Sequence, residues 1–221
     1  KMEGQDLVQA VTLEKPSHWK EFVSHDMDPN LSPDRFKVAL IDCGVKYNIV
    51  RALVYEGCDV TVFPATTEAE VLREYDGVCF SNGPGDPAAV TYGVDLARKL
   101  ISEEKPLFGI CLGHQILGIA LGARTYKLKF GHHGGNHPVK DLQTGRIEVT
   151  SQNHGFSLDE GSVKSAGGEI THINLNDETV EGFRHTSLPL FTVQYHPEAA
   201  PGPRDAAPLF DRFLSSMEGK K

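Results

Sequence analysis

Basic residues are scarce in this 221-residue chain, and long hydrophobic runs are missing. Its 22 Lys and Arg residues are outnumbered by 30 Asp and Glu residues, which gives a formal net charge of −8. Binding to phosphate backbones needs clustered Lys and Arg, so we expect no nucleic-acid partner. No apolar run approaches the roughly 18 residues of a membrane-spanning helix, and the start lacks a basic-then-apolar signal pattern. We therefore expect a cytoplasmic protein with no membrane association.

Cysteine pairs and nucleotide-binding loops are also missing. The four cysteines include no Cys-x-x-Cys pair, and a chain with 39% hydrophobic residues has enough core to need no disulfides. Cys43, Cys58 and Cys79 lie in or beside apolar, strand-like runs, so we expect them to be buried and inert. No Walker-type Gly-rich loop occurs, which predicts no ATP site and no cofactor in this chain.

Three histidines lie close together in residues 131–137. Their spacing matches no zinc pattern and no cysteine lies nearby, so we expect a structural loop and no metal site.

The organisation of the chain changes twice. Residues 1–35 are polar and rich in turn-forming prolines, which predicts a linker or remnant that precedes a domain over 36–218. From Phe36, apolar strand-like runs alternate with helical spacing. Strands are expected at 36–42, 59–63, 78–81 and 107–110, and helices at 48–56, 67–75, 94–101 and 116–121. This alternation predicts an α/β fold: a doubly wound, mostly parallel sheet with helices on both faces.

The second half is expected to add an antiparallel β portion. Strand-like runs recur there without obvious helices, at 137–141, 146–150, 168–174, 180–183 and 191–194. Leu209, Phe210, Phe213, Leu214 and Met217 then fall on one face of a closing amphipathic helix.

The strongest local signal surrounds Cys111. A predicted strand runs into Gly109-Ile110-Cys111-Leu112-Gly113, and helical spacing follows at once. This pattern is the cysteine counterpart of the nucleophile elbow, in which the residues two before and two after a strained nucleophile must be small. The turn would lift the sulfur above the carboxyl edge of the sheet, at a helix N-terminus that favours a thiolate. The same pentapeptide equally suits a buried cysteine in a Gly-rich turn.

A nucleophilic cysteine needs a base and a group that orients the base. His196-Pro197-Glu198 follows the predicted strand at 191–194, and residues two apart in an extended segment project to the same side. His196 is therefore the candidate base and Glu198 its orienting partner. Alone, a His-x-Glu pair is more often a surface feature.

Two segments could stabilise an oxyanion or bind substrate. The amide of Leu112 directly follows the nucleophile, and the Gly83-Pro84-Gly85 turn exposes backbone amides after a neighbouring strand. Residues 151–156 are polar before an aromatic residue and could bind a zwitterion, although a plain turn is the simpler interpretation.

Together these residues resemble a known family. Residues 108–115 with His196-Pro197-Glu198 resemble the triad-type glutamine amidotransferases. Finer matches are similar to the glutaminase (small) subunits of carbamoyl phosphate synthetase, in a bacterial-like form. They lie at 81–87, 130–139, 151–156 and 196–210. The resemblance runs from about Phe36 to the last helix.

The resemblance implies a reaction and a partner. Cys111 would attack the side-chain amide of L-glutamine, His196 would transfer protons, Glu198 would orient His196, and Gly85 and Leu112 would hold the oxyanion. Implied glutamine contacts are Gly83, Gly85, Leu112, Gln115, Asn153, Gly155 and Phe156. Ammonia would pass to a large synthetase subunit that uses MgATP and bicarbonate. Members of this family carry a further N-terminal domain, and residues 1–34 resemble the segment that connects it.

Three alternatives stay open. The chain could serve another pathway, such as anthranilate or aminodeoxychorismate synthesis. It could be a stand-alone γ-glutamyl hydrolase of the same architecture. A non-catalytic binding module fits least, because Cys111, His196 and Glu198 are all present.

Overall fold

One ten-stranded sheet organises the protein. The computed structural model describes residues 2–19, 35–198 and 208–218. In their order across the sheet, the strands are β1 (Ser17–His18), β3 (Cys58–Pro64), β2 (Phe36–Asp42), β4 (Gly77–Phe80), β5 (Leu107–Ile110), β10 (Leu190–Val193), β9 (Val180–His185), β8 (Gly168–Asn174), β6 (Thr125–Asp141) and β7 (Ile147–Leu158).

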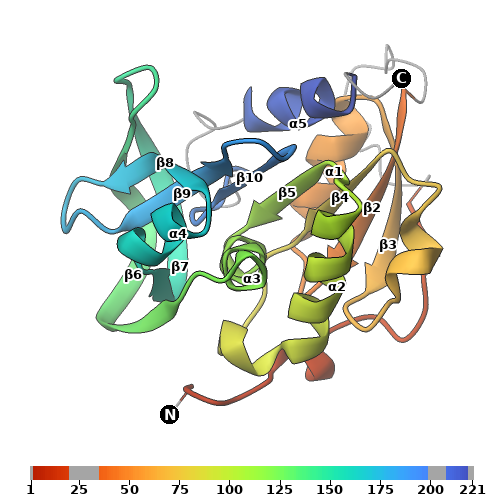
Figure 1. The fold of residues 1–221 in the computed structure, drawn as a ribbon, viewed down its shortest axis with the longest axis horizontal. Coiled ribbons are helices and arrows are strands. Elements are labelled where there is room, and N and C mark those ends of the chain that lie inside the picture. Colours follow the sequence, from red (N-terminus) through yellow and green to blue (C-terminus); the bar gives the residue numbers. More distant parts are fainter. Residues whose placement is uncertain (1, 20–34, 199–207, 219–221) are drawn as a thin grey trace.

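The sheet has a parallel and an antiparallel part. Strands β3, β2, β4, β5 and β10 run parallel, whereas β9, β8, β6 and β7 pair antiparallel and extend to one side (left in Figure 1). The predicted α/β fold class is therefore confirmed. The sequence pattern groups the last strand with the antiparallel set, but β10 pairs parallel with β5 as well as antiparallel with β9, so it joins the two parts.

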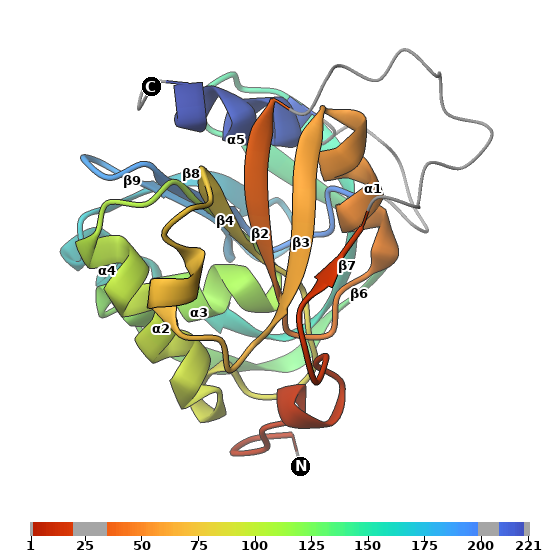
Figure 2. The same cartoon turned by 90° about the vertical axis from the view of Figure 1, so that its right-hand side faces the viewer.

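Helices cover both faces of the parallel part (Figures 1 and 2). Helices α1 (Tyr47–Tyr55) and α5 (Pro208–Glu218) pack with Val38 and Leu40 of β2 on one face. Helices α2 (Thr91–Ser102) and α3 (Leu112–Leu121) pack with Ala39 and Ile41 on the other. Because successive side chains of a strand point to opposite faces, β2 must be apolar at nearly every position. No helix in the described ranges is long and apolar enough to cross a membrane.

The closing helix has the predicted apolar face. All five residues assigned to it are buried in α5. Phe108 of β5 stacks on Phe191 of β10 with ring centroids 4.6 Å apart, and the rings of Phe210 and Phe213 lie 5.8 and 5.7 Å from it. This aromatic cluster attaches α5 to the two strands that precede the catalytic candidates.

Four local predictions were wrong. The expected helix at 67–75 is only a 3-10 turn, Ala69–Leu72, and Lys105 Nζ donates to the carbonyls of Arg73 and Tyr75 where a further helical turn was expected. Residues 131–137 and 151–156, expected as loop and turn, lie within β6 and β7. A short helix, α4 (Glu160–Ser165), was not predicted; Asp159 caps it by accepting from the Ser162 amide.

The segment before residue 36 packs on the domain where it is described. β1 adds an antiparallel edge strand to β3, and Val8 is fully buried. Thr12 Oγ1 donates to the carbonyl of Asp42 (2.6 Å) and accepts from the amide of Ala65 (2.9 Å). Residues 2–19 therefore contact the ends of β2 and β3, although a linker was expected here. The rest of the predicted linker, apart from Arg35, lies outside the described residues.

We expect Thr12→Val to lower the free energy of unfolding by about 1–3 kcal/mol, because it leaves the Asp42 carbonyl and the Ala65 amide without this partner. Denaturant unfolding of the full chain measures the change. The control Thr66→Val alters an exposed threonine and should stay within about 0.5 kcal/mol of the parent. Equal stability of both variants would show that the two Thr12 hydrogen bonds do not contribute.

Candidate active site

Cys111 occupies a strained turn between β5 and α3. Its backbone has φ 55° and ψ −103°, a conformation that non-glycine residues rarely adopt. A Cβ at Gly109 would lie 2.7 Å from the Gly113 carbonyl oxygen, and a Cβ at Gly113 would lie 2.2 Å from that of Phe80. Both glycines are thus required by steric contact, as the elbow pattern predicts. The turn places Cys111 as the N-cap of α3.

His196 and Glu198 meet Cys111 at the carboxyl end of the parallel strands. The Cys111 amide donates to the carbonyl of Val193, the last residue of β10 (2.9 Å). His196 lies three residues further on and lines the same cavity as Cys111, whose side chain is close enough to raise the pKa of the imidazole. The ring nitrogen Nδ1 of His196 donates to Glu198 Oε1 at 2.7 Å. All three residues are at least nine-tenths buried. The structure thus aligns the three predicted catalytic residues.

Interactions among the three residues shift the pKa values of His196 and Glu198 by more than burial does. Burial alone would lower the pKa of His196, but the charge and hydrogen bond of Cys111 and those of Glu198 raise it to about 9. Burial would raise the pKa of Glu198, but its hydrogen bond and charge interaction with His196 lower it. The resting site therefore favours a protonated imidazole held by the Glu198 carboxylate, which is suited to giving a proton to a leaving group.

A lysine and an asparagine support this arrangement and were missed in the sequence. Lys46 Nζ lies 3.4 Å from Glu198 Oε1, so a cation also contacts the buried carboxylate. Asn82 Oδ1 accepts from the Lys46 amide (2.9 Å), and Asn82 Nδ2 donates to the Gly44 carbonyl (2.9 Å). Asn82 therefore joins the loops after β2 and β4. No local sequence motif marks Lys46, because it reaches Glu198 only once β2 and β10 end at the same edge of the sheet.

A cavity of about 350 Å³ opens beside the sulfur. Its lining includes Cys111, His196 and every residue to which the resemblance assigned a glutamine contact: Gly83, Gly85, Leu112, Gln115, Asn153, Gly155 and Phe156. It also includes residues that were not predicted: Met2, Lys46, Asn82, Pro84, Lys127, His133 and His154. The structure brings the predicted set together, and the individual contacts with glutamine stay predictions.

The two sides of the cavity are tied together through Gln115. Its Nε2 donates to the carbonyl of Phe156 in β7 (2.9 Å) and to Gln194 Oε1 (2.8 Å). Asn153 Oδ1 accepts from His133 Nδ1 of β6 (3.0 Å). The amide nitrogen of Gln115 is therefore engaged within the protein, which leaves its Oε1 as the polar atom for a ligand.

The predicted oxyanion donors lie on two rigid segments. Leu112 is the first residue of α3, where backbone amides have no intrahelical partner. Gly85 has φ 100°, and a Cβ there would lie 2.8 Å from the Gln5 carbonyl oxygen. The Asp86 amide donates to the same Gln5 carbonyl (3.1 Å), so the N-terminal segment is in direct contact with this turn. Their role as oxyanion donors stays a prediction.

The other three cysteines have the environment expected of inert thiols. All are buried. Burial raises the pKa of the Cys58 thiol to about 12 and raises those of Cys43 and Cys79 well above the ordinary range. Of the four cysteines, only Cys111 faces a cavity with a base beside it.

An elbow cysteine, a histidine and a carboxylate over a parallel sheet define a class of enzyme that transfers acyl groups through a cysteine. Residues 39–216 match the family described as glutamine amidotransferase class-I, and the chain belongs to this family.

Individual relatives carry more specific names than the family does. The chain is 52% identical over 220 residues to the carbamoyl phosphate synthase small chain of Syntrophotalea carbinolica, covering 97% of this chain and 58% of that protein. It is 53% identical to the protein of the same name from Chlorobaculum tepidum, covering 100% of this chain and 58% of that protein. The chain thus spans little more than half the length of these relatives.

Solved structures share the fold at lower identity. A Thermoplasma acidophilum protein assigned to GMP synthase superposes with a TM-score of 0.71 at 21% identity, covering 83% of this chain and 94% of that one. A glutamine amidotransferase from Thermotoga maritima gives 0.62 at 18% identity, covering 83% of each chain. These likenesses concern the fold alone.

We expect Gly113→Ala to destabilise the protein by about 2 kcal/mol or more, because the added methyl group would meet the Phe80 carbonyl. The matched control is Gly161→Ala in α4, where the nearest atom to a new Cβ is 3.8 Å away and alanine favours the helix. Thermal and denaturant unfolding of both variants measure the difference. A tolerated Gly113→Ala would refute the steric account of the elbow.

We expect the stability of the parent chain to fall as the pH rises. The His196 pKa of about 9 exceeds its ordinary value of about 6.5, so the stabilisation is complete below about pH 6.5 and is lost as the pH passes through about 9. Unfolding free energies at about pH 6.5, 8 and 9.5 measure it. Cys111→Ala removes the leading cause of the raised pKa and should flatten the profile; parallel profiles would contradict the coupling.

Proposed function

We propose that this chain is the glutamine-hydrolysing part of a carbamoyl phosphate synthase small chain. The observation that carries the proposal is the alignment of Cys111, His196 and Glu198 beside the cavity. The class-I amidotransferase family supports the glutaminase chemistry, and relatives about half identical over nearly the whole chain support the pathway.

The first half of the reaction forms a thioester. The Cys111 sulfur attacks the side-chain amide carbon of glutamine, and the amides of Leu112 and Gly85 stabilise the oxyanion of the tetrahedral intermediate. The His196 imidazolium gives its proton to the amide nitrogen as the carbon–nitrogen bond breaks. Ammonia leaves, and the glutamyl group remains on sulfur. Glu198 holds the ring through Nδ1 during both proton transfers.

The second half regenerates the cysteine. Water attacks the thioester carbonyl while His196, now neutral, accepts a proton from that water. The carbon–sulfur bond breaks and glutamate leaves. We propose that these steps use only the side chains and backbone amides of this chain, with no cofactor. The ammonia passes to a large synthetase subunit, where MgATP and bicarbonate yield carbamoyl phosphate for arginine and pyrimidine synthesis in the cytoplasm.

We expect the chain to release glutamate and ammonia from glutamine, and to do so faster with a synthetase large subunit. Cys111→Ser should reduce the release by about 10³-fold or more while the protein remains folded. Glu198→Gln should cost less than His196→Asn, because orienting the base contributes less than proton transfer. Enzymatic detection of glutamate measures all three.

Labelling by a glutamine-like chloroketone provides an independent check. The reagent should modify Cys111 and spare the three buried cysteines, so the Cys111→Ser variant should remain unlabelled. Full activity in Cys111→Ser, or equal labelling of both proteins, would refute the assignment of the nucleophile.

A further inference from the structure

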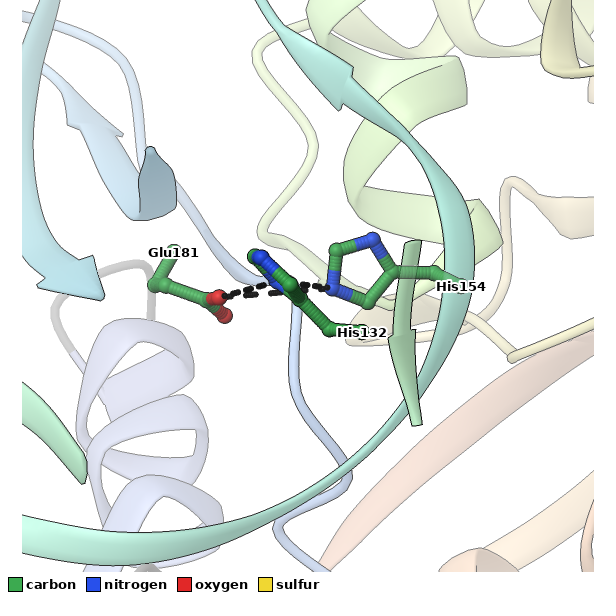
Figure 3. A group of neighbouring side chains, drawn as sticks. All are labelled: His132, His154 and Glu181. Carbon is green, nitrogen blue, oxygen red and sulfur yellow. Dashed lines mark hydrogen bonds and ion pairs between the residues drawn. The ribbon is translucent and has the colours of Figure 1, made fainter. Parts of the chain in front are cut away.

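A second cluster of polar side chains adjoins the cavity, which one of its members, His154, also lines. His132 of β6, His154 of β7 and Glu181 of β9 point toward one another from three strands (Figure 3). Their exposed fractions are 6%, 6% and 0%. None of the three belongs to the catalytic triad. Burying two imidazoles and a carboxylate is costly unless a charge balances them.

The three ligand atoms have the separations of a metal site. His132 Nδ1 lies 3.2 Å from His154 Nε2 and 3.3 Å from Glu181 Oε1, and His154 Nε2 lies 4.0 Å from Glu181 Oε1. A point equidistant from these atoms lies about 2.1 Å from each. That is the bond length of zinc to imidazole nitrogen and to carboxylate oxygen.

Hydrogen bonds on the far side of each imidazole direct the lone pairs of His132 and His154 toward the centre of the cluster. His154 Nδ1 must carry the hydrogen, because it contacts the carbonyl of Phe156 at 2.8 Å and a carbonyl only accepts. His132 Nε2 donates to Asp177 Oδ2 at 2.8 Å. When each ring carries one hydrogen, His132 Nδ1 and His154 Nε2 face each other with their lone pairs at 3.2 Å, and only the Asn174 amide, 3.5 Å from His132 Nδ1, lies near enough to donate to that atom. Orientation of ligand histidines by a carboxylate or a carbonyl is the usual outer shell of a metal site.

Gln152 adds a fourth acceptor. Its Nε2 donates to Glu181 Oε2 (2.8 Å), which fixes the amide so that Oε1 lies 2.9 Å from His154 Nε2. Asn174 Nδ2 donates to Glu181 Oε1 at 2.9 Å. Among the described residues no donor lies between Gln152 Oε1 and His154 Nε2. A proton on His132 Nδ1 would face both His154 Nε2 and Glu181 Oε1 but would leave Gln152 Oε1 against His154 Nε2, whereas one cation would attract all four acceptor atoms.

We propose that His132, His154 and Glu181 bind one Zn²⁺ ion, with Gln152 Oε1 as a fourth ligand. Two imidazoles with oxygen donors suit zinc among the divalent cations. The sequence predicted no metal here, because the ligands come from separate strands and Glu181 is 27 residues from the nearer histidine.

The ion would brace the wall of the glutamine cavity. His154 lies between Asn153 and Gly155, which line that cavity, and its ring bonds the carbonyl of Phe156. Zinc would therefore hold this part of β7 against β6 and β9. This consequence rests on the proposed function, whereas metal binding itself does not.

The test measures zinc content of the full 221-residue chain, purified without a histidine tag and dialysed against zinc. We expect about one zinc per chain by mass spectrometry of the metal. Glu181→Gln and His132→Asn should each weaken zinc binding by more than about 100-fold, since even outer-shell changes cost roughly 10- to 100-fold. The control His18→Gln removes a histidine from an exposed His–carboxylate pair and should keep one zinc.

Cobalt substitution of the parent chain supplies a second readout that needs no variant. Co²⁺ in this cluster should give the intense visible absorption of a four-coordinate ion, and Zn²⁺ should displace it. Absence of stoichiometric zinc and of this spectrum would overturn the proposal. The cluster would then be held together by a shared proton instead of a metal ion. Equal zinc content in the parent, Glu181→Gln and His132→Asn would overturn it too. Glutaminase activity plays no part in either measurement.

Discussion

The parallel pairing of β5 with β10 is the constraint on which the site depends. Four consecutive residues of each strand are in register, and the pairing continues through the bond from the Cys111 amide to the Val193 carbonyl. Both strands therefore end at the same edge, so the residues that follow them meet there. A nucleophile and a base separated by more than eighty residues in the chain become neighbours through this ladder.

Burial and charge act against each other at that edge. Removing His196 from water disfavours its charged form and lowers its pKa, but its interactions with Cys111 and Glu198 raise the pKa by more. The raised pKa of His196 requires both Cys111 and Glu198. It also requires that water be excluded from the site, because charges exposed to water interact far more weakly. Gln115, whose side-chain amide donates to the Phe156 carbonyl across the cavity, contributes to that closure.

The antiparallel part of the sheet holds the wall opposite the nucleophile. β10 links it to the parallel part, since the strand pairs with β5 on one side and β9 on the other. The buried polar residues of β6, β7 and β9 converge behind Asn153 and Gly155, and their hydrogen bonds fix the orientation of β7. Substrate binding and the core of this half are therefore built from the same strand.

The sequence by itself determined the first four parallel strands, β2 to β5, the elbow and the closing helix, because these signals are local. A strand buried on both faces is an apolar run, and a strained cysteine needs small neighbours at fixed spacing. It also pointed to His196 and Glu198, whose pairing spans two residues. It failed for residues 131–137 of β6 and 151–156 of β7, whose glycines and polar residues resemble loops, and for the helix expected at 67–75.

Only the tertiary structure decided the contact of Lys46 with Glu198 and the meeting of His132, His154 and Glu181. Neither set has a spacing that a sequence pattern could reveal. Strand order across a sheet differs from strand order along the chain, so side chains on non-consecutive strands become neighbours only when hydrogen bonding fixes the whole sheet.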